Sequence, residues 1–269
     1  MGSRSENERS FGVTAYEAAE ATSLAFRERA LQYVFLPAAS FDADDGGVQE
    51  IEPLVKAIRR HTSALVLAAL HPPRTLRWID HAYAIGVDGI SFNLEVPNVP
   101  SLERLWPGRA RYIGRSRYLQ ALRHAGKIFP RGTVWTELLL GACPVTELSE
   151  LIEELISWNV LPFFVPTHPL SHSRTMPLAF SSSSDEATAL LHQLQSLLLP
   201  NAPPRPWLPA WPHLLGPLDL PATEAARTNL TKRGCLKSRL ELLAVRNLAR
   251  LRRSLRVRCL AEHEYEGSG

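Results

Sequence analysis

Cysteine is scarce in this chain of 269 residues, and the three present, Cys143, Cys235 and Cys259, are far apart. A disulfide framework usually needs an even set of cysteines. A structural zinc site needs thiolates or imidazoles at short paired spacing. We therefore expect three ordinary reduced thiols and neither kind of cross-link.

Long hydrophobic runs are also missing. No uncharged apolar stretch reaches the roughly 18 residues that a membrane span requires, and the first residues are too polar for a secretion signal. We therefore expect a cytoplasmic protein without a membrane span.

The sequence has no P-loop, nucleophile elbow or His-Glu-x-x-His motif. No Gly-x-Gly-x-x-Gly turn follows its first apolar run, which disfavours a dinucleotide-binding fold.

Acidic and basic residues are unevenly distributed. Residues 231–269 contain ten Lys/Arg and four Asp/Glu, a balance of +6, so the first 230 residues carry −3 of the net +3. Residues 231–260 combine a leucine stripe with arginines on another face, which predicts a basic amphipathic helix. It would either dock on the main domain or contact an anionic partner such as RNA, acidic protein or lipid headgroups. No aromatic platform accompanies the arginines, which disfavours nucleic acid.

Short apolar runs alternate with amphipathic segments between residues 14 and 199. This alternation predicts a parallel sheet with helical crossovers, hence an α/β fold. A partial (β/α) barrel and an open doubly wound sheet both fit, and in both of them ligands bind at the carboxyl ends of the strands. The expected strands are 33–36, 65–67, 87–96, 134–140 and 160–165. The expected helices are 14–25, 51–58, 76–85, 118–129, 146–158 and 185–199.

The remaining segments differ in composition. Residues 200–230 are rich in proline, which excludes regular helix or central strand. Trp207 and Trp211 lie among the prolines, and a disordered linker would not need them. We expect a strap across the barrel surface, with a free proline-rich ligand for another domain as the alternative. Residues 1–13 and 261–269 are expected to be disordered tails.

Candidate site residues follow the third expected strand. Asn93 and Glu95 are two positions apart near its carboxyl end, so on a strand they would share a face. An amide beside a carboxylate can hold a ribose diol or a substrate amine. Alternatively, both side chains satisfy backbone amides of the following loop. His71 follows another strand and could face the same opening. His168 and His172 flank the last strand and are better explained as polar loop residues.

The segment 86–95 reads Gly-Val-Asp-x-Ile-x-Phe-Asn-Leu-Glu. It resembles the fourth strand of radical SAM enzymes of the biotin synthase and lipoyl synthase kind. Further pieces resemble the family in the same order, across roughly residues 14–199. The resemblance implies a TIM-type barrel of the radical SAM kind. These further pieces of resemblance are Pro107-Gly108-Arg109, residues 114–122, the expected strand end at residues 138–141 followed by Glu147, and residues 159–162.

The resemblance implies roles for particular residues. Asn93 and Glu95 would contact S-adenosylmethionine, and Arg115 or Arg117 would hold its carboxylate, since a guanidinium pairs with a carboxylate bidentately. Ser40 stands where the family has the glutamate of Gly-Gly-Glu, which grips the methionine amine. Without that carboxylate, S-adenosylmethionine binding is expected to be weak.

The family's Cys-x-x-x-Cys-x-x-Cys motif, which holds a [4Fe-4S] cluster, is missing from this sequence. Thiolates bind the irons, and no other side chain here substitutes for them. We therefore expect a radical SAM-like pseudoenzyme or partner subunit that keeps part of a small-molecule pocket. One alternative is an N-terminally incomplete radical SAM enzyme acting on an unknown small molecule. Another is a non-radical barrel enzyme that uses Glu95 as its acid/base.

The expected strand at residues 32–36 would lie at the rim of the sheet if no strand precedes it. It is apolar and uncharged, so it lacks the usual protection against edge pairing. Its cover would be the strap, the basic helix, a second copy in a homodimer, or a partner protein. With none of these, the chain is expected to aggregate or dimerise.

Overall fold

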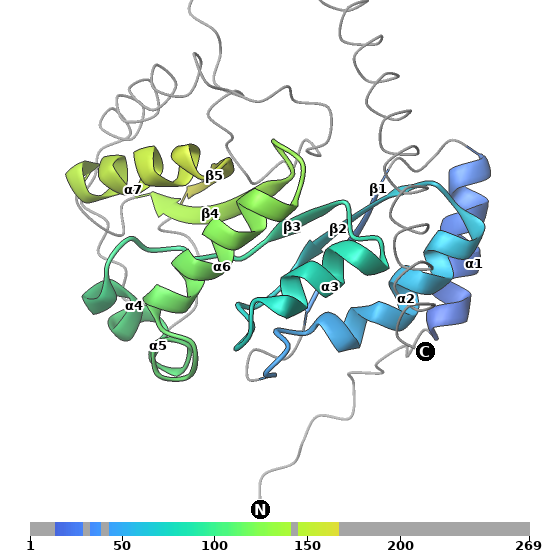
Figure 1. Ribbon diagram of the computed structural model, residues 1–269, viewed down its shortest axis with the longest axis horizontal. Helices are drawn as coiled ribbons and strands as arrows, with labels where there is room; N and C mark the ends of the chain where they lie inside the picture. Colours follow the sequence, from blue (N-terminus) through green and yellow to red (C-terminus); the bar gives the residue numbers. More distant parts are fainter. Residues whose placement is uncertain (1–13, 29–32, 39–42, 141–144, 167–269) are drawn as a thin grey trace, which may run out of the picture.

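The computed structural model describes residues 14–28, 33–38, 43–140 and 145–166 (Figure 1). The helices are α1 (Ala15–Arg27), α2 (Val48–His61), α3 (Arg77–Ile85), α4 (Val99–Leu105), α5 (Pro107–Tyr112), α6 (Arg115–Ile128) and α7 (Val145–Ser157). The strands are β1 (Tyr33–Pro37), β2 (Leu65–Ala69), β3 (Gly89–Ser91), β4 (Val134–Leu140) and β5 (Val160–Pro166).

The five strands form one parallel sheet in the order β1-β2-β3-β4-β5. Each new strand is therefore added on the same side of the one before it. A doubly wound sheet would reverse direction at a switch point, whereas a barrel does not. Helices α2, α3 and α6 follow one another across the sheet and contact their neighbours (Figure 1). The predicted α/β partial barrel is confirmed, and the doubly wound alternative is excluded.

Four of the five expected strands appear within two residues of their predicted ends. The expected strand 87–96 was wrong, because β3 comprises Gly89–Ser91 alone. Helix α1 begins at a capping box, in which the Thr14 hydroxyl and the Glu17 carboxylate each accept a backbone N–H of the other residue. Helices α4 and α5 were not anticipated. The expected helix 185–199, the strap and the basic helix lie outside the described residues.

The sheet buries side chains on both faces, as parallel sheets do. One face packs against the helices in a single core that includes Val66, Ile90 and Val134. The opposite face carries a smaller cluster built around Leu67, Trp135 and Phe163. Gly89 lies on this second face, where a Cβ atom would come within 2.9 Å of the Leu67 side chain. The missing side chain at Gly89 makes room for the large residues of the neighbouring strands.

Strand β1 ends the strand order of the described sheet, next to β2, as the expected rim strand should. The strap and the basic helix, two of the expected covers for its outer edge, lie outside the described residues, so the expected aggregation or dimerisation stays a prediction. Helices α2 and α6, with 14 residues each, are the longest helices described. None of the described helices is both long and apolar enough to cross a membrane.

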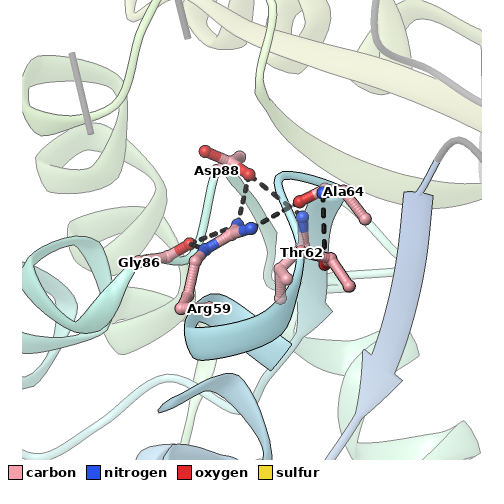
Figure 2. A network of polar contacts seen from close by, with 6 residues as sticks. Arg59, Thr62, Ala64, Gly86 and Asp88 are labelled. Carbon is pink, nitrogen blue, oxygen red and sulfur yellow. Dashed lines mark hydrogen bonds and ion pairs between the residues drawn. The ribbon is translucent and has the colours of Figure 1, made fainter. Parts of the chain in front are cut away.

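An ion pair closes the end of the sheet at which β2 and β3 begin (Figure 2). The Arg59 guanidinium, from the last turn of α2, contacts the Asp88 carboxylate and donates to the carbonyl of Ala64. It also donates to the carbonyl of Gly86, at 2.9 Å from Nε and 2.7 Å from Nη2. Gly86, directly after the expected helix 76–85, adopts a left-handed φ of 114°. One guanidinium therefore binds the chain termini of a helix and two strands.

Asp88 completes the same junction. Its carboxylate accepts the Val66 amide at 3.0 Å, and its own amide donates to the Val66 carbonyl at 2.8 Å. Both charged side chains are largely buried, 14% exposed for Arg59 and 5% for Asp88. The Asp of the Gly-Val-Asp sequence thus has a structural role at the strand entrance, far from the carboxyl edge.

We expect Asp88→Ala to lower the free energy of unfolding by about 3–5 kcal/mol, because it leaves a buried guanidinium without its countercharge. Lys56→Ala is the control, since its pair with Glu52 is surface-exposed, with the Lys56 side chain 56% exposed. That change should cost less than about 1 kcal/mol. Urea denaturation of both variants is the measurement. Equal losses would show that the Arg59 junction contributes no more than a surface pair.

Candidate functional site

A cavity of about 310 Å³ opens at the carboxyl edge of the sheet. Its lining comes from the ends of the first three strands and from α5. Pockets at this edge are the usual ligand sites of barrel folds, and the volume lies at the lower end of the range for small-molecule sites. The lining residues are Pro37, Ala38, Ala69, Leu70, His71, Asn93 and Arg109.

The early end of β3 creates the polar part of this cavity. From Ser91 to Glu95 the chain advances four residues, whereas the paired stretch of β4, from Trp135 to Leu138, advances three. The extra residue makes this segment a bulge, a device that re-aims side chains next to functional sites. Pairing resumes at Glu95, whose amide donates to the Glu137 carbonyl at 2.8 Å. Asn93 therefore lies within the bulge and not on a regular strand.

The side chain of Thr136 satisfies the backbone groups that the bulge frees. Its hydroxyl donates to the Phe92 carbonyl at 2.8 Å and accepts the Leu94 amide at 3.0 Å. Thr136 is fully buried. Asn93 lies between Phe92 and Leu94, so Thr136 fixes the backbone on both sides of it.

Asn93 presents an amide oxygen that is buried and has no hydrogen-bond partner among the described residues. Such a group costs about 1–3 kcal/mol when left unsatisfied. Because Asn93 lines the cavity, a bound donor can satisfy it. Asn93 lies at the carboxyl edge where the sequence placed it, although not on the regular strand assumed for it. Its contact with a ligand stays a prediction.

Glu95 does not share the cavity wall with Asn93. It has a left-handed φ of 66°, which is rare for a residue other than glycine. Its carboxylate accepts a hydrogen bond from Arg109 Nη1 at 2.7 Å. The two side chains are 17% and 29% exposed, respectively. Glu95 therefore acts on the cavity through Arg109, which is itself a lining residue.

Burial outweighs the ion pair in setting the pKa of the Glu95 carboxyl. It raises the pKa of Glu95, and the charge and hydrogen bond of Arg109 oppose that shift. The Arg109 guanidinium also lies over the Trp106 ring, 5.8 Å from its centroid, within cation–π range. The carboxylate and the ring together orient Arg109 at the cavity and leave some of its five N–H donors for a ligand.

His71 lines the same cavity, as its place after β2 suggested. Its amide donates to the Gly46 carbonyl at 3.0 Å. Gly46 has a φ of +71°, and a Cβ atom there would lie 2.0 Å from the His71 carbonyl oxygen. Burial lowers the pKa of His71, and the positive charge of Arg109 adds to that effect while Glu50 opposes it. The imidazole is therefore held toward its neutral form.

The other predicted ligand residues lie elsewhere. The Arg115 guanidinium donates to the Pro97 carbonyl, which fixes the first turn of α6, and Arg115 is not among the cavity residues. Arg117 is half-buried and is not among them either. Ser40 lies outside the described residues. The sequence reasoning named the Pro-Gly-Arg segment but assigned no role to Arg109, which is the arginine that reaches the cavity.

Within the segments that the structure describes, no group of three His, Cys, Asp or Glu side chains could hold a metal ion. All three cysteines lie outside those segments. The expectation that this chain holds no [4Fe-4S] cluster therefore stays a prediction.

No protein-family model and no curated protein matches the sequence. Two solved structures of HydG match the fold, each with a TM-score of 0.51. One is described as a maturase of the FeFe-hydrogenase, at 13% identity. The other is the FeFe-hydrogenase maturase from Carboxydothermus hydrogenoformans, at 14% identity. The match covers 70% of this chain but only 43% and 44% of those chains. This chain thus shares its fold with part of the HydG structures.

We expect acid to destabilise the fold through His71. A lowered pKa means that the folded chain binds fewer protons than the unfolded chain, so this contribution is complete above the ordinary pKa of about 6.5 and is lost as the pH falls. His71→Gln should flatten the decline of the unfolding free energy between about pH 7.5 and 5.5. His61→Gln, which removes an exposed imidazole, is the control. Identical slopes in wild type and His71→Gln would contradict the burial argument.

Proposed function

We propose that this chain binds a small zwitterionic molecule of the S-adenosylmethionine class in the cavity. We propose further that it acts as a pseudoenzyme or partner subunit without an iron–sulfur cluster of its own. The observation that supports ligand binding best is the buried, unpartnered amide oxygen of Asn93 at the cavity wall. A polar atom in that position needs a donor that the described residues do not provide.

The cavity offers complementary groups for such a molecule. Asn93 Oδ1 can accept a hydrogen bond from an ammonium or a ribose hydroxyl. The Arg109 N–H groups not used by Glu95 can donate to a carboxylate, with the geometry that guanidinium groups favour. His71, held toward its neutral form, adds a polar contact without a second positive charge. The apolar lining from β1 and β2 can accept the uncharged part of the ligand.

The radical SAM-like fold supports this choice of ligand, and the sequence resemblance to the biotin synthase kind points the same way. In that family, S-adenosylmethionine together with a [4Fe-4S] cluster supplies radical chemistry. The sequence contains no clustered thiolates, so we assign this chain a binding role only. A cluster motif upstream of this sequence would instead make the chain part of an active enzyme. A cytoplasmic location remains part of the proposal.

A non-radical enzyme that uses Glu95 as its acid/base is the second candidate. The raised pKa of Glu95 favours it, because carboxyls in such roles often have raised pKa values. Its hydrogen bond to Arg109 and its place behind the lining residues count against it, since a general acid must reach the reacting atom. We therefore assign Glu95 to positioning Arg109.

We expect isothermal titration calorimetry to show weak binding of S-adenosylmethionine, on the order of 0.1–1 mM, because few polar contacts anchor it. Asn93→Ala should weaken this binding about 5-fold to 10-fold through loss of one hydrogen bond. Arg109→Gln should weaken it more, since a charge-assisted bond is lost.

Arg117→Gln is the matched control for Arg109→Gln, and it should leave the affinity unchanged. This pair of variants compares the sequence-based choice of arginine with the one that the cavity indicates. Micromolar binding that neither Asn93→Ala nor Arg109→Gln disturbs would refute the proposed site. Unfolding curves of each variant confirm that any loss of binding is not a loss of fold.

We also expect anaerobic reconstitution of the chain with iron and sulfide to give no stoichiometric [4Fe-4S] cluster, because its three cysteines are widely spaced in sequence. Iron analysis and absorbance near 400 nm are the measurements. A brown protein with about four irons per chain would sink the pseudoenzyme proposal, since a bound cluster has that composition.

A further inference from the structure

Ser91 carries a buried hydroxyl at the carboxyl end of β3 that the proposed binding site does not yet use. The residue is 0% exposed, and its Oγ has no hydrogen-bond partner among the described residues. Asn93 Oδ1, two positions later, is in the same state. An unsatisfied buried polar group destabilises the folded protein, and alanine would fill the place of Ser91 without that penalty. Two such groups in succession indicate a role in binding and not in folding.

The register of the sheet places the Ser91 side chain in the same row as two residues of the cavity wall. Ser91 is the partner of Ala69 on β2, and Ala69 is the partner of Pro37 on β1. Partners on adjacent parallel strands project from the same face of a sheet. Ala69 and Pro37 both line the cavity, so Ser91 continues the row that they form. The Leu70 amide donates to the Ser91 carbonyl at 3.0 Å, which fixes the backbone at this position.

Trp135, the partner of Ser91 on β4, extends away from the cavity. A Cβ atom at Gly89 would lie 3.4 Å from Trp135 Cζ3, so the ring reaches toward the residue two positions before Ser91. In the other direction along the chain, Asn93 lines the cavity. Phe92, between the two polar residues, packs in the core on the helix side, which leaves Ser91 and Asn93 together on the inner face. The Ser91 hydroxyl therefore lies between the Trp135 ring and the cavity.

The chemistry of the two atoms indicates which kind of ligand group they can hold. The amide oxygen of Asn93 accepts hydrogen bonds, whereas the hydroxyl of Ser91 can both donate and accept. One ligand hydroxyl can therefore donate to Asn93 and accept from Ser91 at the same time. A ligand ammonium fits this position less well, because burying a charge without a countercharge is costly. The described residues that line the cavity include the cation Arg109 but no carboxylate.

We infer that Ser91 is a ligand-binding residue, and that Ser91 and Asn93 together bind one uncharged hydroxyl group at the inner side of the cavity. Arg109 then binds the anionic end of the ligand, so the ligand is held at two separate points. The choice of S-adenosylmethionine as the first probe rests on the proposed function. The role of Ser91 does not, and the two can be tested separately.

The first experiment needs no ligand and compares two buried hydroxyls by urea denaturation of the full chain. Thr136 is as buried as Ser91, but its hydroxyl is paired with Phe92 and Leu94. Thr136→Val should shift the unfolding equilibrium about 10-fold or more toward the unfolded state. Ser91→Ala should leave the equilibrium unchanged or shift it toward the folded state. A loss from Ser91→Ala as large as that from Thr136→Val would show a structural role for the hydroxyl and overturn the inference.

The second experiment is a double-variant cycle on the affinity for S-adenosylmethionine, followed by chemical-shift titration. Ser91→Ala should weaken binding about 5-fold to 10-fold, as Asn93→Ala does, through loss of one hydrogen bond. The double variant should lose little more than either single variant, because both side chains hold the same ligand group and their effects are coupled. Ser101→Ala is the control, since Ser101 is a buried serine of α4 that does not line the cavity. Binding that Ser91→Ala leaves unchanged, or losses that multiply in the double variant, would overturn the inference.

Absence of S-adenosylmethionine binding would overturn the proposed function, and glycerol, an uncharged polyol, would then decide the role of Ser91. Glycerol should shift the side-chain amide signal of Asn93, which Asn93→Ala assigns, and Ser91→Ala should weaken that shift. Methylammonium, which offers a charged donor, should shift the signal less than glycerol does. No shift with glycerol, or a shift that Ser91→Ala leaves unchanged, would overturn the inference.

Discussion

The Thr136 hydroxyl holds the bulge on which the arrangement of the cavity depends. Between Ser91 and Glu95 the segment after β3 contains one residue more than the stretch of β4 beside it, so a backbone carbonyl and a backbone amide lose their regular partners inside the protein. Buried backbone groups must be paired, and this hydroxyl pairs both, at Phe92 and at Leu94. Asn93 is carried between them into the cavity wall. A regular strand would have continued to pair with β4 and would have left no bulge to re-aim Asn93.

The opposite end of the same strands is closed by charge. Arg59 and Asp88 bind the beginnings of β2 and β3 to the ends of two helices (Figure 2), and Gly89 lets the large side chains of the adjacent strands meet. The sheet is thus tightly fixed where its strands start, and its irregular backbone is confined to where they end. This division is expected of a barrel, in which one edge provides stability and the other edge provides function.

The elements that local pattern governs were predictable, and those that tertiary contacts govern were not. Apolar runs with β-branched and aromatic residues located β1, β2, β4 and β5, and the amphipathic pattern of residues 76–85 located α3. The segment 87–96 failed because its alternating apolar residues fit a strand, whereas the bulge depends on a hydroxyl more than forty residues later in the sequence. Helices α4 and α5 were not predicted, although Pro100 and Pro107 lie in their first turns, where proline is tolerated.

The site shows the same limit at the level of single side chains. Sequence placed Asn93 at the carboxyl edge, since strand order alone determines which residues meet there. It could not choose among the arginines of the segment 104–117, because that choice depends on which guanidinium groups are already hydrogen-bonded to other parts of the fold. Arg115 is occupied by the Pro97 carbonyl, and Arg109 is directed at the cavity by Glu95. A signal was present in Trp106, since an aromatic ring next to an arginine favours an oriented guanidinium.

The pair of Glu95 and Arg109 has an energetic profile that suits binding better than folding. A left-handed φ at a residue other than glycine costs about 1–3 kcal/mol, and Glu95 adopts one. Taking two charges out of water costs several kcal/mol more, which the ion pair only partly offsets. Two apolar side chains would stabilise the same position at less expense. An arrangement that is costly to fold, and that aims a guanidinium into a cavity beside an unsatisfied amide, provides preorganised polar groups for a ligand. Under the proposed function, a bound ligand recovers free energy that folding gives up at this edge.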